Sequence, residues 1–255
     1  HLSNGLPSFS IVGMPETAVR ESKDRVRSAL LNSGFAFPAG RITVNLAPAD
    51  LPKAGGRYDL AIALGILAAS GQLPLEVLDN REFHGELALS GALRSVPGLL
   101  PVAVRGIGSG RELVVPAEAR EELAIISRLV VRHACSLASL VEALLAGGPP
   151  PEQISGAVAG GTALLPRVAG VPDFAEVRGQ QAVRRALEVA VSGGHNLLMS
   201  GPPGAGKTLL ASCLPGILPP LTEAEAIEVA AVHSVHGVGR GVGLWRQAPL
   251  RAPHH

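Results

Sequence analysis

A glycine-rich octapeptide between an apolar run and a predicted helix constrains this chain more than any other feature. Residues 201–208 read GPPGAGKT and fit the pattern G-x-x-x-x-G-K-[ST] without a mismatch. The apolar run Asn196–Ser200 predicts a strand before it, and Lys207–Leu214 predicts a helix that ends at Pro215. A strand, a glycine-rich loop and a helix in this order indicate a phosphate-binding loop.

The residue types of this loop suit a nucleoside triphosphate. Glycines let the backbone bend so that successive N–H groups point at anionic oxygens, and the N-terminus of the following helix adds its positive dipole end. Lys207 is expected to reach the β and γ phosphates of ATP, and Thr208 to ligate Mg²⁺. The predicted nucleotide-binding residues are Gly201, Pro202, Pro203, Gly204, Ala205, Gly206, Lys207 and Thr208, with Lys207 and Thr208 as catalytic residues and Thr208 as metal ligand.

The competing interpretation of the octapeptide is a glycine-rich turn with an accidental Lys-Thr pair. It is disfavoured because the flanking strand and helix are both predicted. Cys213, at helical spacing behind the loop, is expected to be a small buried apolar residue.

Length and composition describe an ordered globular chain of about two domains. At 255 residues, with 47% hydrophobic and 17% charged residues, the chain can bury enough apolar surface to offset its ordering entropy. A formal net charge of +1 gives no overall reason to expect nucleic acid or an anionic membrane as partner. The longest apolar stretch, Leu60–Ala69, is too short to span a bilayer. Cys135 and Cys213 are far apart and lack metal-ligand spacing, so we expect a reducing cytoplasm.

Proline and glycine divide the chain. The segment Ala146–Ser155, AGGPPPEQIS, is predicted to exclude regular structure and to start a linker. We therefore expect a first domain at 1–147, a linker at 148–172 and a second domain at 173–255. Because His1 is not an initiator methionine and no signal-peptide pattern follows it, we expect the chain to be a fragment.

The first domain is predicted to mix strands and helices, which indicates the α/β class. Its predicted strands are Phe9–Val12, Ile42–Leu46, Glu86–Leu89 and Glu112–Val115, and its predicted helices are Thr17–Ser33, Asp59–Ser70 and Gly98–Arg105. In the second domain, Gly179–Ser192 has apolar residues at helical spacing and predicts a helix.

Two long segments resemble a known family. Asp173–Leu221, which contains the octapeptide, resembles the magnesium-chelatase branch of the AAA+ ATPases, and Phe9–Leu60 resembles the ComM (YifB) family. The resemblance implies a Lon-protease-like α/β domain followed by the N-terminal part of an AAA+ P-loop domain. It further implies ATP and Mg²⁺ as cofactors, and a homo-hexameric ring that promotes branch migration of DNA during natural transformation.

The resemblance also implies roles for individual residues. It places Val177, Arg178 and Gly179 near the adenine, although a plain turn at a helix start explains Gly179 equally well. In the family, the groups that position the attacking water and the arginine finger follow the RAPHH segment, which ends at His255. We therefore expect this chain to bind ATP without turning it over.

The same resemblance argues against proteolysis by the first domain. A Lon-type site needs a serine and a lysine of lowered pKa, but Arg57 stands at the serine position and no lysine occurs between Lys53 and Lys207. The domain is therefore expected to lack the dyad and to serve assembly or partner contact. Arg57 and Asp59 are expected to form an ion pair or a solvated edge.

Histidines and basic residues give weaker signals. His233 with His236, and His254 with His255, lack an acidic or cysteine partner at ligand spacing, so ordinary surface histidines are favoured over a metal site. The basic residues of the helix at 17–33 alternate with acidic ones and have no interleaved aromatic residues, which favours a solvated face over a nucleic-acid patch.

Two rival functions stay open. The octapeptide segment alone does not separate a DNA motor from an ATPase subunit that drives magnesium insertion into a tetrapyrrole. A third hypothesis is an interaction module that binds ATP without hydrolysing it.

Overall fold

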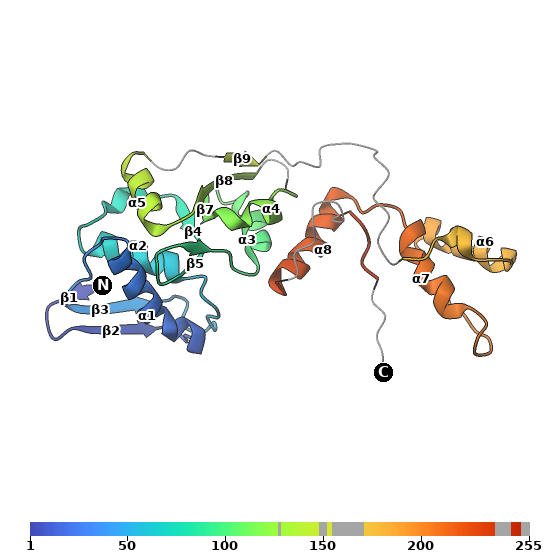
Figure 1. Ribbon diagram of the computed structural model, residues 1–255, viewed down its shortest axis with the longest axis horizontal. Coiled ribbons are helices and arrows are strands. Elements are labelled where there is room, and N and C mark those ends of the chain that lie inside the picture. The colour runs from blue at the N-terminus through green and yellow to red at the C-terminus, as the bar shows by residue number, and fades with distance from the viewer. Residues whose placement is uncertain (127–128, 148–151, 155–170, 238–245, 251–255) are drawn as a thin grey trace. The chain divides into compact units, whose positions relative to one another are not determined.

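The computed structural model describes residues 1–126, 129–147, 152–154, 171–237 and 246–250 (Figure 1). The chain divides into two compact units, one of His1–Ala159 with Ser234–Val238 and one of Gly160–His233 with Gly239–His255. The units divide at Ala159 and Gly160, which lie outside the described ranges, and again at His233 and Ser234, which are described. The predicted linker at 148–172 therefore stays a prediction except where it overlaps a described strand.

The first unit is α/β, as the sequence predicts. Its strands are β1 (Leu2–Ser3), β2 (Ser8–Val12), β3 (Arg41–Asn45), β4 (Arg81–Phe83), β5 (Glu86–Leu87), β6 (Leu93–Arg94), β7 (Glu112–Pro116), β8 (Leu129–Ala134) and β9 (Glu152–Ile154). Its helices are α1 (Thr17–Asn32), α2 (Asp59–Ala69), α3 (Leu99–Gly106), α4 (Arg120–Leu123) and α5 (Leu137–Leu145), with short 3₁₀ turns η1 (Leu75–Leu78) and η2 (Ala117–Ala119).

These strands form three small sheets. The first has the order β1-β3-β2, in which β2 and β3 are parallel and α1 provides the crossover. The second has the order β4-β7-β8-β9 and is parallel except for the antiparallel edge strand β9. The third is the antiparallel pair β5-β6.

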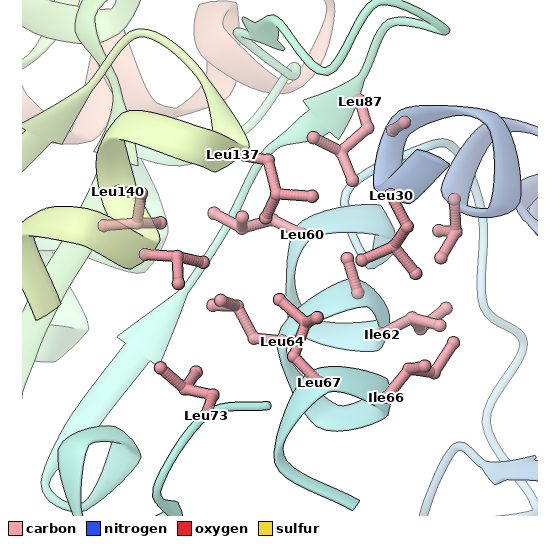
Figure 2. Packing of buried hydrophobic residues seen from close by; sticks show 14 of the residues in the cluster. Leu30, Leu60, Ile62, Leu64, Ile66, Leu67, Leu73, Leu87, Leu137 and Leu140 are labelled. Carbon is pink, nitrogen blue, oxygen red and sulfur yellow. The ribbon is translucent and has the colours of Figure 1, made fainter. Parts of the chain in front are cut away.

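The core of the first unit surrounds α2. This helix buries residues around most of its circumference, as expected for a helix rich in Ala, Leu and Ile. Figure 2 shows its leucine and isoleucine side chains beside Leu30 of α1, Leu87 of β5 and Leu137 of α5. The predicted buried helix at Asp59–Ser70 is therefore confirmed to within a residue.

A buried ion pair fixes the start of α2. Asp59 is fully buried and accepts hydrogen bonds from Arg25 Nε at 2.7 Å, from Ser22 Oγ, and from the backbone N–H of Leu87 at 3.3 Å. The Asp59 carboxylate raises the pKa of the Arg25 guanidinium. The expected pairing of Arg57 with Asp59 is wrong, because the Arg57 guanidinium donates instead to the Pro97 carbonyl at 3.0 Å.

Two further expectations for the first unit need correction. Ala146–Ser155 is not free of regular structure, because Glu152–Ile154 forms β9 by pairing with β8. The sequence analysis also missed β4 and β8, which are stabilised by pairing on either side of β7.

The second unit is helical in its described residues. It contains the 3₁₀ turn η3 (Phe174–Glu176), α6 (Gln181–Gly193), α7 (Lys207–Ile217) and most of α8 (Glu223–Val235). Figure 1 shows α6 and α7 adjacent, and Leu187 of α6 and Leu210 of α7 belong to one buried cluster. The sequence analysis predicted that helix α7 ends at Pro215. This is wrong, because the helix continues to Ile217.

The predicted strand at Asn196–Ser200 is absent. These residues have no regular secondary structure and pair with no strand of the described chain. Leu198 is 94% exposed. A strand is defined by its hydrogen-bonded neighbour, so apolar composition alone cannot form one.

Candidate nucleotide-binding site

The loop at 201–208 turns directly into a helix. Gly206 is the residue before α7, and its φ of 83° lies in the left-handed region that favours glycine. Gly204 has a φ of 81° for the same reason. The turn leaves the N-terminus of α7 facing the loop, where a positive dipole end can attract an anion.

Lys207 lies folded across this loop. Its Nζ donates hydrogen bonds to the carbonyl oxygens of Gly201 at 2.7 Å and Pro202 at 2.8 Å. The ammonium group is therefore held above the turn that would surround the phosphates. Both acceptors are neutral carbonyls, which an anionic phosphate oxygen would outcompete.

Thr208 follows on the first turn of α7 and is exposed. Among the described residues its hydroxyl makes no hydrogen bond, while its carbonyl accepts one from Ser212 Oγ at 2.8 Å. The hydroxyl is thus available to a cation. A Mg²⁺ ion bound to ATP takes most of its ligands from phosphate and water, so this hydroxyl can supply one protein ligand.

A residue that the sequence analysis missed connects this loop to α6. Gln180 Nε2 donates to the Ala205 carbonyl at 3.1 Å. Gln180 itself has a φ of 50°, next to Gly179 with a φ of 71°, so two consecutive left-handed residues turn the chain into α6. The only sequence signal was the position of Gln180 after a glycine at a helix start.

The residues predicted to lie near the adenine occupy this same turn. Val177 is buried and its carbonyl accepts a hydrogen bond from Arg184 at 3.4 Å, whereas Arg178 and Gly179 are exposed. The structure has the turn geometry of the alternative interpretation. Contact with an adenine stays a prediction for all three residues.

A hollow of about 380 Å³ lies next to the loop. It is mostly apolar, with Lys207 and Gln180 at its polar side. Its lining comes from α6, the Asn196–Ser200 segment and the loop, and includes Val183, Ala186, Met199 and Leu210. Apolar walls with few polar groups suit a planar base beside a phosphate site.

Other candidate residues take no part in this site. Cys213 is buried, and burial raises the pKa of its thiol, which agrees with a small apolar role. The described residues contain no group of three or more His, Cys, Asp or Glu side chains placed to hold a metal. His254 and His255 lie outside the described residues. No helix in the described ranges is long and apolar enough to cross a membrane.

In comparisons with known proteins, the two units match family models that describe the same subunit of magnesium chelatase. A family model described as subunit ChlI of Mg-chelatase matches residues 1–119, and one described as magnesium chelatase, subunit ChlI, matches residues 173–255. The chain is 48% identical over 258 residues to the uncharacterized protein YifB of Salmonella typhimurium and 47% identical over 255 residues to competence protein ComM of Haemophilus influenzae. These alignments cover 100% of this chain and 49% and 50% of the two relatives, so the chain spans about half of their length.

Proposed function

Because this chain belongs to the ComM/YifB family of magnesium-chelatase-like proteins, we propose that it is the ATP-binding part of an AAA+ ATPase. The observation that carries the proposal is the loop at 201–208, with Lys207 held across it and α7 starting directly behind it. ATP with Mg²⁺ is the proposed ligand.

Binding would rearrange a few contacts of this chain. The triphosphate draws Lys207 Nζ away from the carbonyls of Gly201 and Pro202, and the loop N–H groups and the α7 N-terminus hold its oxygens. Thr208 Oγ1 ligates Mg²⁺. The base enters the apolar hollow between α6 and the loop, beside Gln180 and close to Val177, Arg178 and Gly179.

For the whole protein we propose a motor that promotes branch migration of DNA in natural transformation. Its support is the 47% identity with a protein named for competence, along the full length of this chain. A homo-hexameric ring in the cytoplasm, with ATP hydrolysed between neighbouring subunits, belongs to the same proposal. The first unit would serve as a Lon-like domain without the Ser/Lys dyad.

Insertion of magnesium into a tetrapyrrole is the alternative. The family model that matches residues 1–119 is itself named for a chelatase subunit, so the presence of the first unit does not separate the two activities. The identity with the competence protein is what favours DNA.

Substitution of Lys207 tests the nucleotide site. Lys207→Ala removes a charge that touches only loop carbonyls, so the fold should stay intact. Charge-assisted hydrogen bonds contribute about 1.5–3 kcal/mol each, so MgATP affinity should fall on the order of 100-fold. Lys23→Ala, on α1, is the matched control and should bind normally. Equal affinity of the Lys207 variant and the unaltered chain in calorimetry would refute the site.

Two further measurements test turnover by this chain and the substrate of the whole protein. This chain is proposed to bind MgATP with negligible phosphate release. The arginine finger that the family resemblance implies follows the RAPHH segment, and such a residue contributes about 10³ to 10⁵ in rate. Motor-like turnover by this chain, abolished by Lys207→Ala, would refute that point. For the whole protein, branched DNA should stimulate ATPase activity and a porphyrin with Mg²⁺ should not. The reverse result would favour the chelatase.

A further inference from the structure

A cleft on the first unit combines aromatic, apolar and cationic side chains. It has a volume of about 490 Å³ and lies between α1, the start of β2 and the segment before β3. We call it the α1 cleft. Its lining residues are Pro7, Ser8, Phe9, Arg27, Leu31, Phe37, Pro38, Ala39 and Gly40.

Two of the seven aromatic residues of this chain line the cleft. The chain has only five phenylalanines, one tryptophan and one tyrosine, and two of the phenylalanines, Phe9 and Phe37, line the cleft. Their ring centroids are 6.0 Å apart at an interplanar angle of 43°. Both rings are partly exposed at its walls.

A guanidinium group completes the aromatic wall. The Arg27 side chain, on the exposed face of α1, lies 5.2 Å from the centroid of the Phe37 ring. No acidic residue is among the lining residues. Asp24, one turn before Arg27, is the nearest acidic residue on that face of α1, and no ion pair joins the two. The sequence analysis found no aromatic residue near these basic ones, because Phe9 and Phe37 come from other segments.

The positive charge continues away from the cleft along the helix. Arg20, Lys23 and Arg27 follow one another at intervals of three and four residues, which places them on one face of α1. They span about 10 Å of helix rise. Asp24 lies on the same face of α1, so the three basic residues and this one carboxylate leave the stripe with a net positive charge. Glu21 faces Arg25 instead, at 3.8 Å.

We propose that the α1 cleft binds single-stranded DNA, with a base stacked against Phe37 and Arg27 and the backbone phosphates along the Arg20–Lys23–Arg27 stripe. Single-strand sites combine aromatic faces for bases with cationic grooves for phosphates, and arginine planes also stack on bases. An acidic peptide would use the stripe but would leave the aromatic wall without a partner. The cleft belongs to the first unit and shares no residue with the nucleotide loop of the second. The proposal rests on the proposed function, for which it supplies a contact with DNA.

The test is fluorescence anisotropy of a labelled 15-nucleotide oligo-dT, titrated with this chain at low salt and without ATP. Arg27→Gln should weaken binding on the order of tenfold and lower the magnitude of the salt slope by about 0.7. Phe37→Leu should weaken binding to a similar degree and leave the salt slope unchanged. Arg105→Gln makes the same charge change at an exposed site on α3 and should bind like the unaltered chain.

Phe37 packs against the core, so a loss of binding by Phe37→Leu could reflect a folding defect. Arg27→Lys tests stacking at an exposed residue instead, because it keeps the charge and removes only the planar group. It should also bind more weakly than the unaltered chain. The proposal is overturned if the unaltered chain does not bind the oligonucleotide, if Arg27→Gln and Arg105→Gln lose affinity equally, or if poly-glutamate competes better than oligo-dT. Because no nucleotide is present, failure here is independent of the MgATP titration with Lys207→Ala.

Discussion

The two units differ in how fully their described residues pair into sheets and pack into a core. In the first, a large core surrounds α2, and each of β3, β7 and β8 is paired on both sides. In the second, the buried cluster consists of Phe174, Val177, Leu187, Leu210 and Cys213. The segment that leads into the phosphate loop is unpaired. In the described residues, the first unit is therefore a paired and packed scaffold, while the second carries the candidate loop at 201–208 on two packed helices.

This contrast suits the roles that we propose. Ligand-binding loops are commonly among the least stable parts of a fold, so low local stability is expected at 201–208. The aromatic wall of the α1 cleft must hold its shape before binding. Phe9 lies on the paired strand β2, and both Phe9 and Phe37 pack against the core, although Phe37 belongs to the segment before β3 that has no regular secondary structure.

Hydrogen exchange would show the largest effect. Among the described residues, the N–H groups of Asn196–Ser200 donate no hydrogen bonds, so they should exchange at near-intrinsic rates. Amides in the middle of α2 should exchange only through global opening of the first unit, which for a stability of about 5 kcal/mol slows them more than 10³-fold. MgATP should slow exchange in the phosphate loop and leave α2 unchanged. Similar protection of both segments, measured by mass spectrometry, would contradict the contrast.

Removal of the buried carboxylate of α2 should give the next largest effect. Asp59→Ala removes the acceptor of the Ser22 hydroxyl and of Arg25 Nε, while the 20% exposed Arg25 side chain keeps its hydrogen bond to the Ala18 carbonyl. The expected cost is about 3 kcal/mol of unfolding free energy, at the low end for a broken buried pair. Urea unfolding of the first unit gives this value. Asp79→Ala, at an exposed site, should change stability by less than about 0.5 kcal/mol. Equal midpoints for the two variants would show that the buried pair is not what fixes α2.

The same contrast explains what sequence could and could not predict. Helices α1, α2 and α6 were found because their apolar spacing is local, and β2, β3 and β7 because their short apolar runs coincide with paired strands. The strand at Asn196–Ser200 failed for the opposite reason, since no pairing partner lies beside it. Strand β9 was missed because pairing with β8 holds three residues of a proline-rich segment in extended form.

In the candidate site, too, local features could be predicted from the sequence and contacts between distant residues could not. The phosphate loop is a contiguous motif, so eight residues indicate its chemistry. Gln180 reaches Ala205 across 25 positions of sequence, and no local pattern predicts that contact. The approach of Arg27 to Phe37 likewise depends on how the chain returns after α1.

The smallest effect concerns a partly exposed cluster of one carboxylate and two guanidinium groups on the second sheet. Glu112 of β7 accepts hydrogen bonds from Arg132 Nε at 2.8 Å and from Arg81 Nε at 2.8 Å, on the two neighbouring strands. Both guanidinium groups, Arg132 first, lower the pKa of the Glu112 carboxyl below its ordinary value of 4.5. A lowered folded-state pKa gives stabilisation that is complete above about pH 4.5 and is lost as pH falls through the folded value.

Glu112→Gln should therefore lower the unfolding free energy at pH 7 and have progressively less effect below pH 4.5. Because the Glu112 side chain is 36% exposed, solvent screening keeps the difference below about 1 kcal/mol. The measurement is urea unfolding of both proteins between about pH 3 and pH 7, with Glu76→Gln, at an exposed site, as control. A difference that grows as the pH falls would reverse the sign required by this ion pair, and the stability of the sheet would then have to come from its backbone pairing and apolar packing alone.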